Sequence, residues 1–227
     1  MDKLTKNDLH FVVSRLPKDI KSLLTKYPEL MIAGGFIRAT IAGERVSDID
    51  LFGKDKKALK SVAQEIALKR KGRVHETDNA ITVLAPPRTP LQFITRWLYT
   101  DPVALVKSFD YTICQAVIAF RNEKWISQCS SMFYPDLAAR RLNYTSPVRN
   151  EDAGGSILRM RKFVSKGYTI QADSMAKVIA RLVSNIDFNK AATEEEIAII
   201  VVSLLREVDP LVIIDGLEMV DEHEIKE

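Results

Sequence analysis

The chain has 227 residues, of which 46% are hydrophobic and 28% are charged, and its formal net charge is +3. This length suffices for one large domain or for a domain with a smaller companion, and the composition excludes a largely disordered chain. Two cysteines are too few for a disulfide framework. No segment reaches the roughly 18 uninterrupted apolar residues of a membrane span, so we expect a soluble, cytoplasmic protein with no membrane partner.

Positive charge is concentrated in one segment rather than spread evenly. The basic residues of that segment are Lys54, Lys56, Lys57, Lys60, Lys69, Arg70, Lys71 and Arg73. Such a run usually marks a solvated helix face, and a nucleic-acid partner is the alternative interpretation. An acidic segment at 215–227 offsets it.

The first half of the chain alternates between helical and strand patterns. Apolar spacing predicts two short helices within 7–25, separated by Pro17. Further along we expect strands at 30–33, 49–52, 73–76, 80–84 and 91–95, and helices at 36–42, 58–68 and 101–107. Gly43 is expected to end the helix at 36–42, and Asp101 with Pro102 to begin the helix at 101–107.

The second half turns helical after a hairpin. Residues 111–126 predict two strands joined at Arg121–Lys124. Helices are then expected at 136–142, 156–166, 174–184 and 193–207. The last begins with a capping box formed by Thr193 and Glu196. We therefore expect an α+β fold with two parts, a mixed-sheet domain at 1–148 and a helical domain at 149–227.

Two aspartates flank one apolar residue at the predicted second strand. Asp48 and Asp50 are two positions apart, so on a strand both side chains point to one face while Ile49 and Leu51 point to the other. Carboxylates held this close repel each other, and a shared hard cation such as Mg²⁺ relieves the repulsion. The spacing suits a metal-dependent phosphoryl or nucleotidyl transfer site.

A glycine pair lies where the first predicted strand meets a helix. Gly34 and Gly35 allow backbone N–H groups to approach an anion, and the helix N-terminus adds a favourable potential for phosphate. Arg38 follows one turn later, where it could contact phosphate or brace the aspartates. Each pattern alone is common in turns and loops. Their order, with twelve residues between Gly35 and Asp48, carries the functional interpretation.

This order resembles the signature of the nucleotidyltransferase superfamily related to DNA polymerase β. Within it, the chain is similar to the head of class II tRNA nucleotidyltransferases (CCA-adding enzymes) and bacterial poly(A) polymerases. The matching positions are Gly34, Gly35, Arg38, Gly43, Asp48 and Asp50. The resemblance implies a polymerase β-like catalytic head followed by a helical neck-like region. It also implies two Mg²⁺ ions on Asp48 and Asp50, and an NTP held by Gly34, Gly35 and Arg38.

The resemblance continues downstream and covers roughly residues 30 to 165. The segments SFDYTICQA, the hairpin around RNEK and PDLAARRL follow in the family's order, and Glu151–Asp152 precedes SILRMRKF. On this basis Asp110 and Arg159 are further nucleotide-binding candidates. The chain also departs from the family. Ser108 and Phe109 replace a pair of arginines, Cys114 replaces an asparagine, and Gln92 stands where many relatives carry a third carboxylate.

The sequence leaves three functions open. The first is metal-dependent transfer of a nucleoside monophosphate from an NTP to RNA, for which a tRNA 3′ end is a candidate, with release of pyrophosphate. The second is transfer of AMP or UMP to a protein or small molecule. The third is a non-catalytic descendant that binds RNA or protein. The apolar C-terminal helices also suggest a homodimer, with packing inside one chain as the alternative.

Overall fold

A computed structural model describes residues 1–145, 147, 153–191, 193–206, 214–215 and 218–219 of the chain. The chain divides into two compact units, Met1–Ala138 and Ala139–Glu227, which are described separately. This division falls earlier in the chain than the boundary predicted at 148–149, and those two residues lie outside the described ones.

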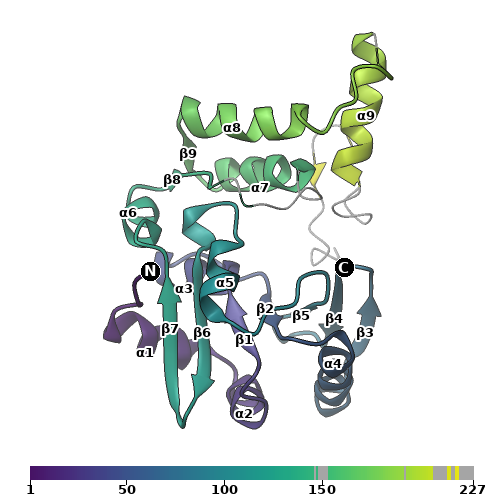
Figure 1. The fold of residues 1–227 in the computed structure, drawn as a ribbon. Coiled ribbons are helices and arrows are strands. Elements are labelled where there is room, and N and C mark those ends of the chain that lie inside the picture. The colour runs from purple at the N-terminus through teal and green to yellow at the C-terminus, as the bar shows by residue number, and fades with distance from the viewer. Residues whose placement is uncertain (146, 148–152, 192, 207–213, 216–217, 220–227) are drawn as a thin grey trace. The chain divides into compact units, whose positions relative to one another are not determined.

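A seven-stranded mixed sheet forms the centre of the first unit (Figure 1). Its strands are β1 (Met31–Ala33), β2 (Ile49–Phe52), β3 (Arg73–Glu76), β4 (Ala80–Leu84), β5 (Leu91–Ile94), β6 (Ala116–Arg121) and β7 (Lys124–Cys129). They lie in the order β3-β4-β5-β2-β1-β6-β7. Only the β2–β5 pair of this sheet is parallel. The sheet places the start of β2 near its middle, which is where the carboxylate motif lies.

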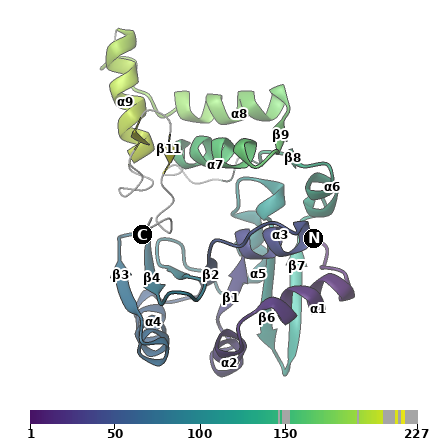
Figure 2. The ribbon, with the colours of Figure 1, turned by 180° about the vertical axis from the view of Figure 1, so that it is seen from behind.

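Helices cover both faces of this sheet (Figures 1 and 2). They are α1 (Lys6–Arg15), α2 (Lys18–Lys26), α3 (Gly35–Ala42), α4 (Lys56–Arg70), α5 (Pro102–Lys107) and α6 (Phe133–Ala138), with a short 3₁₀ turn at Thr112–Cys114. On one face, called here the α4 face, Lys60 of α4 forms an ion pair with Glu76 of β3, and Arg70 of α4 binds Asp19 of α2. On the other, the α5 face, α5 packs with Leu105 and Val106 against Met31, Phe52 and Val117.

Local sequence signals explain how these elements begin and end. Asp101 accepts hydrogen bonds from the backbone N–H groups of Val103 and Ala104, as an N-cap does. Gly43 ends α3 in the left-handed conformation at φ 68°. Every strand and helix expected between residues 7 and 126 is present, with ends shifted by a few residues. The expected mixed sheet flanked by helices is confirmed.

The second unit is mainly helical. It contains α7 (Ala153–Ser165), α8 (Ala172–Val183) and α9 (Glu194–Arg206), and the short strands β8 (Arg141–Leu142), β9 (Thr169–Ile170), β10 (Ile214–Asp215) and β11 (Glu218–Met219). The capping box is confirmed: the Thr193 hydroxyl accepts from the Glu196 N–H at 3.2 Å, and Glu196 accepts from the Thr193 N–H at 3.0 Å. No helix in the described part of the chain is long and apolar enough to cross a membrane.

The helix predicted over 136–142 is wrong in its second half. The helix ends at Ala138, and Arg141–Leu142 instead pairs with Thr169–Ile170 in a two-stranded parallel sheet. Arg140 has φ 47°, a left-handed conformation that takes the chain out of the helix. Its side chain donates to the backbone oxygen of Lys166 at 2.8 Å, so a contact distant in sequence overrides the local helical pattern.

Candidate nucleotidyl transfer site

The glycine pair forms a tight turn between β1 and α3. Gly34 has φ 76° and ψ −123°, a conformation that is accessible to glycine and costly for other residues. Its N–H donates to the backbone oxygen of Ala116 at 3.0 Å, which fixes the turn to the start of β6. Gly35 begins α3, and a Cβ added there would meet no atom within 4 Å. The N-terminus of α3 is therefore open at Gly35, where the N–H groups of the first helical turn lie.

The two aspartates lie at the start of β2. Ile49 and Leu51 are buried on the α4 face, whereas Asp48 and Asp50 are partly exposed. Asp48 immediately precedes the strand and Asp50 lies within it, so the alternation places both carboxylates on the α5 face. The burial pattern at the start of β2 therefore agrees with the prediction that Ile49 and Leu51 pack on one face while Asp48 and Asp50 lie on the other.

Strand register brings the glycine turn to the carboxylates. Met31 lies opposite Phe52, and Ile32 lies opposite Leu51 in the antiparallel β1–β2 pair. Continued along both strands, this register places the C-terminal end of β1 opposite the start of β2, where Asp48 lies. On the other side of β2, Gln92 of β5 is the register partner of Asp50. The residue that replaces a third carboxylate is therefore a direct neighbour of the motif, and it offers a neutral amide.

Phe109 lies against the glycine turn. A Cβ added to Gly34 would come within 3.0 Å of the Phe109 ring, and this ring makes an edge contact with Phe52 at 6.0 Å between centroids. The Gln115 side chain donates to the backbone oxygen of Phe109 at 3.0 Å, which holds the segment in place. The next residue, Asp110, is buried. Phe109, one of the two residues that replace a pair of arginines, thus lies beside the turn, and its apolar ring fills the contact with Gly34.

The remaining predicted site residues occupy different surroundings. Arg38 is buried, and its guanidinium lies 3.5 Å from the Glu44 carboxylate, so a contact within the head accounts for part of its charge. Arg159 lies on α7 in the second unit, whereas the aspartates and glycines lie in the first. The structure therefore brings together Gly34, Gly35, Asp48 and Asp50, with Asp110 one residue beyond the Phe109 contact.

The donor set suits a hard cation that keeps part of its coordination shell for substrate. Among the described residues, no group of three or more His, Cys, Asp or Glu side chains could hold a metal ion. Mg²⁺ is commonly bound by one or two carboxylates, with water and substrate phosphate completing its octahedron. Asp48 and Asp50 would supply such ligands, because both are partly exposed at the same end of β2.

A buried ion pair supports the backbone beneath the carboxylates, and the sequence did not reveal it. Arg70, whose side chain is fully buried, donates to Asp19 at 2.8 and 3.2 Å and to the backbone oxygen of Thr89 at 3.0 Å. The next carbonyl, that of Pro90, accepts from the Ile49 N–H at 3.0 Å, between the two aspartates. Arg70 belonged to the basic run, and only its position on the inner side of α4, next to Ala67 and Ile66, distinguished it from the exposed lysines.

Burial alone would raise the pKa of Asp19, but the hydrogen bonds and charge of Arg70 outweigh this effect and hold that pKa below its ordinary value. The carboxylate is therefore ionised in the folded protein at neutral pH. Its charge compensates the buried guanidinium that positions the Thr89–Pro90 segment.

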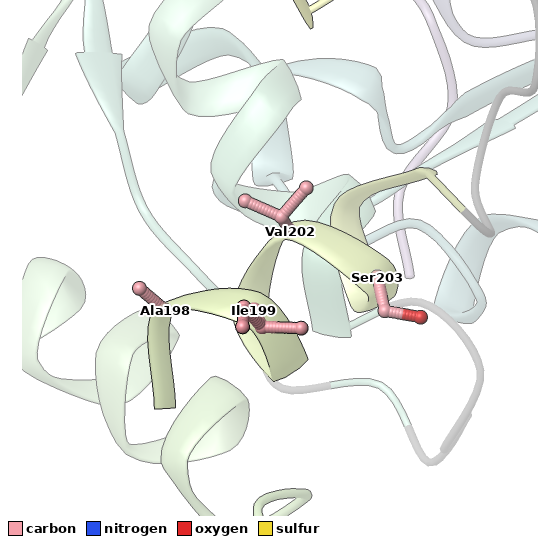
Figure 3. A pocket seen from close by; sticks show the side chains of 4 residues that line it. All are labelled: Ala198, Ile199, Val202 and Ser203. Atoms are coloured by element: carbon pink, nitrogen blue, oxygen red, sulfur yellow. The ribbon is translucent and has the colours of Figure 1, made fainter. Parts of the chain in front are cut away.

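A shallow pocket in the second unit does not share this chemistry (Figure 3). It is lined by Ala198, Ile199, Val202 and Ser203 of α9. None of these side chains carries a charge or a carboxylate, so this pocket offers no ligand for a metal ion or a triphosphate.

Comparison with known proteins identifies the family. Residues 3–140 match the sequence profile described as Gabija anti-defense 2 family protein. The chain belongs to the Gabija anti-defense 2 family. The protein named Gabija anti-defense 2 from Bacillus phage SPbetaL7 is 25% identical over 154 residues, which are 68% of this chain and 37% of that protein. The chain thus spans little more than a third of the length of this relative.

Solved structures with a similar fold include CCA-adding enzymes and tRNA-processing enzymes. The Thermotoga maritima CCA-adding enzyme complexed with tRNA matches with a TM-score of 0.56 and 16% identity, over 77% of this chain and 45% of that one. A CCA-adding enzyme complexed with ATP matches with a TM-score of 0.58 and 18% identity, over 77% and 44% of the two chains. A tRNA-processing enzyme in an apo form matches with a TM-score of 0.54 and 17% identity, over 88% and 61%. The expected nucleotidyltransferase head fold is confirmed for this member of the anti-defense family.

Proposed function

We propose that this chain is a Mg²⁺-dependent nucleotidyltransferase that transfers a nucleoside monophosphate from an NTP to an acceptor. The observation that best supports this proposal is that Asp48 and Asp50 share the α5 face at the start of β2, beside the Gly34–Gly35 turn. Fold similarity to enzymes solved with ATP and with CTP supports an NTP as the substrate. The region 1–148 would form the catalytic head, and 149–227 a neck-like helical part.

The residues of this chain divide the work between binding and orientation. The turn at Gly34 and Gly35 would hold the β- and γ-phosphates at the N-terminus of α3. The Gly34 N–H is bonded to Ala116, so the donors would be the Gly35 N–H and the N–H groups that follow it. Asp48 and Asp50 would hold Mg²⁺, which when bound would neutralise phosphate charge and favour departure of pyrophosphate. An acceptor hydroxyl attacks the α-phosphorus, its proton goes to solvent, and the bond between the α-phosphorus and the bridging oxygen breaks.

The residues beside Gly34 offer the nucleotide fewer charged contacts than arginines would. Ser108 and Phe109 carry no positive charge, so neither can neutralise the triphosphate as an arginine would. Asp110 and Arg159 remain proposed nucleotide-binding residues, and Arg38 would act from behind α3 by bracing the turn. The greater part of phosphate neutralisation then falls to the helix N-terminus and the metal.

RNA is the preferred acceptor, and a protein is the second candidate. Fold relatives solved with tRNA, or described as tRNA-processing enzymes, support RNA, including a tRNA 3′ end. Membership of a family named for opposing the Gabija defence supports a macromolecule of that defence as the acceptor, and a protein would then receive AMP or UMP. A homodimer stays a prediction, and the exposed apolar side chains of the second unit, among them Ile179, Phe188 and Ile199, support it.

The test uses the purified chain with Mg²⁺ and each α-labelled NTP in turn. Total tRNA, or an extract of cells carrying the defence system, serves as acceptor, and RNA is then resolved from protein. We expect label in one fraction, and a loss of at least about 1,000-fold with Asp48→Asn/Asp50→Asn, since both metal ligands are neutralised. Asp78→Asn, an exposed acid in the β3–β4 turn, is the matched control and should retain activity.

The outcomes separate the candidates. Label in RNA supports the first candidate, and label in protein moves the second to its place. If neither fraction is labelled by the wild-type chain with any NTP, the enzymatic proposal is wrong, and a binding function of the fold replaces it.

A further inference from the structure

The α5 face continues from the carboxylates across the sheet to its open edge. Asp50 is the register partner of Gln92 on β5, Gln92 pairs with Thr82 on β4, and Thr82 pairs with His75 on β3. Register partners in a sheet point to the same face. One row of polar residues therefore links the proposed metal site to β3, over three strand spacings or about 14 Å. Thr82 in this row is buried, whereas Asp50, Gln92 and His75 are partly or fully exposed.

Arg73 lies at the end of this face, one strand alternation from His75. Arg73 pairs in register with Leu84, and it is two residues from His75, so both side chains belong to the α5 face. The intervening Val74 and the following Glu76 belong to the α4 face, which agrees with the ion pair between Glu76 and Lys60 of α4. Both Arg73 and His75 are exposed.

Two lysines adjoin Arg73 where α4 turns into β3. Lys69 is in the last turn of α4, and Lys71 is its C-cap, with φ 55°. Both are exposed, and within the described residues neither Lys71 nor Arg73 forms an ion pair with a carboxylate. Arg70 between them is fully buried with Asp19, so it anchors this corner without adding to its surface charge. The group Lys69, Lys71, Arg73 and His75 is called the β3 corner below.

Structural roles explain only part of this charge. Lysines near a helix C-terminus interact favourably with its dipole, and charges on an edge strand discourage pairing with other chains. Neither effect requires Arg73 and His75 to share the face of the carboxylates. β5 runs parallel to β2, and β4 and β3 each reverse direction in turn, so β3 again runs in the direction of β2. The first residues of β3 therefore lie at the same end of the sheet as Asp48.

We propose that the β3 corner binds the phosphodiester backbone of a single-stranded polynucleotide whose end lies at Asp48 and Asp50. The inference rests on the proposed nucleotidyl transfer and specifies its acceptor. Exposed cations about 14 Å from the carboxylates and on their face suit a chain of phosphates that leads away from the reacting end.

The experiment measures RNA binding separately from transfer. The full chain, with no NTP or metal, is titrated into a fluorescein-labelled single-stranded RNA of about 12 nucleotides, within the usual range of such sites. Anisotropy is recorded at several salt concentrations. The test variant is Lys71→Glu/Arg73→Glu. The matched control is Lys56→Glu/Lys57→Glu, which changes the charge equally at the other end of the 15-residue helix α4, about 20 Å away.

We expect the corner variant to weaken binding at least about tenfold at 0.1 M salt, and the control variant by less than about twofold. The slope of log K against log salt should fall by about 1.4 in magnitude, because each lost phosphate contact on a single strand contributes about 0.7. Equal weakening of RNA binding by both variants would overturn the proposal, since binding would then depend on the net charge of the protein and not on the β3 corner. Absence of RNA binding by the wild-type chain would also overturn it.

Failure of this inference differs from failure of the proposed function. Asp48→Asn/Asp50→Asn should abolish transfer and keep RNA binding, since its substitutions leave the β3 corner intact. If transfer to RNA occurs and Lys71→Glu/Arg73→Glu changes neither binding nor the KM for RNA, the corner proposal is wrong and the enzyme stands. If the corner binds RNA and no NTP is ever transferred, the enzymatic proposal is wrong and the corner stands. Labelled protein without RNA binding would replace the polynucleotide with a protein acceptor.

Discussion

The two glycines of the turn predict opposite effects on stability for the same substitution. Gly34→Ala forces a side chain into φ 76°, ψ −123°, at a cost of about 2 kcal/mol. The added Cβ also comes within 3.0 Å of the Phe109 ring, and relief of such overpacking costs about 1 to 3 kcal/mol more. We expect a loss of about 3 to 5 kcal/mol in the free energy of unfolding, a large part of the stability of a domain.

Gly35→Ala should stabilise the unit instead. Gly35 has an ordinary helical conformation at the start of α3, and its Cβ would meet no atom within 4 Å. Replacing a helical glycine by alanine then gains about 0.5 to 1 kcal/mol, chiefly by restricting the unfolded chain. The methyl group would nevertheless stand in the space proposed for phosphate, so transfer activity should fall while stability rises.

Urea unfolding followed by tryptophan fluorescence measures this contrast. Both tryptophans, Trp97 and Trp125, lie in the first unit, so the signal reports the unit that contains the turn. The variant Gly34→Ala/Phe109→Ala separates the two causes, because removing the ring relieves overpacking and leaves the backbone strain. We expect the coupling between the two substitutions to be about 1 to 2 kcal/mol. Equal effects of alanine at Gly34 and Gly35 would refute this account of the turn.

Three further outcomes follow from the buried pair and the capping box. Arg70→Met should lower the free energy of unfolding by about 3 kcal/mol, because it leaves the Asp19 carboxylate without its buried partner. Arg88→Ala removes a more distant and exposed side chain from the same carboxylate, and should cost less than about 1 kcal/mol in the same urea assay. Because the pKa of Asp19 is lowered in the folded state, the stabilisation by this carboxylate is complete above its unfolded pKa near 3.8 and is lost as pH falls through the folded pKa. The difference in free energy of unfolding between wild type and Arg70→Met should therefore shrink below about pH 4. A difference that stays constant from about pH 7 to pH 3 would contradict the ion-pair assignment. Thr193→Val should destabilise α9 by about 1 kcal/mol through loss of the hydroxyl that accepts from Glu196, measured by thermal melting of the far-ultraviolet circular dichroism signal, with no change in nucleotide transfer.

The family position sets the biological question more sharply than the fold does. Similarity to CCA-adding enzymes below 25% identity establishes the head fold, while the sequence profile places the chain in an anti-defense family. A nucleotidyltransferase head in that family makes covalent modification of an acceptor a testable route for opposing a defence. The labelled-NTP experiment distinguishes RNA from protein at the first step.

The sequence by itself determined the elements of the head and the motif on them. Helix boundaries at Gly43 and Asp101, the strand at Ile49–Phe52 and the opposite orientation of Asp50 and Leu51 follow from local rules, because caps, glycines and two-residue alternation act within a few residues. The same rules failed at Arg140. There a hydrogen bond to the Lys166 backbone, 26 residues away, ends the helical pattern.

Only the tertiary structure decided what surrounds the motif. The neighbour of Asp50 is Gln92 because β2 and β5 pair in parallel, and strand order cannot be read from local pattern. Arg70 is a buried partner of Asp19 while the lysines next to it in sequence face solvent, since successive residues of a helix are rotated by about 100° about its axis and only one side of α4 is packed. The Phe109 ring meets Gly34 across 75 residues of chain, through the pairing of β1 with β6. Local chemistry specified the carboxylates and glycines, and long-range packing specified which groups stand beside them.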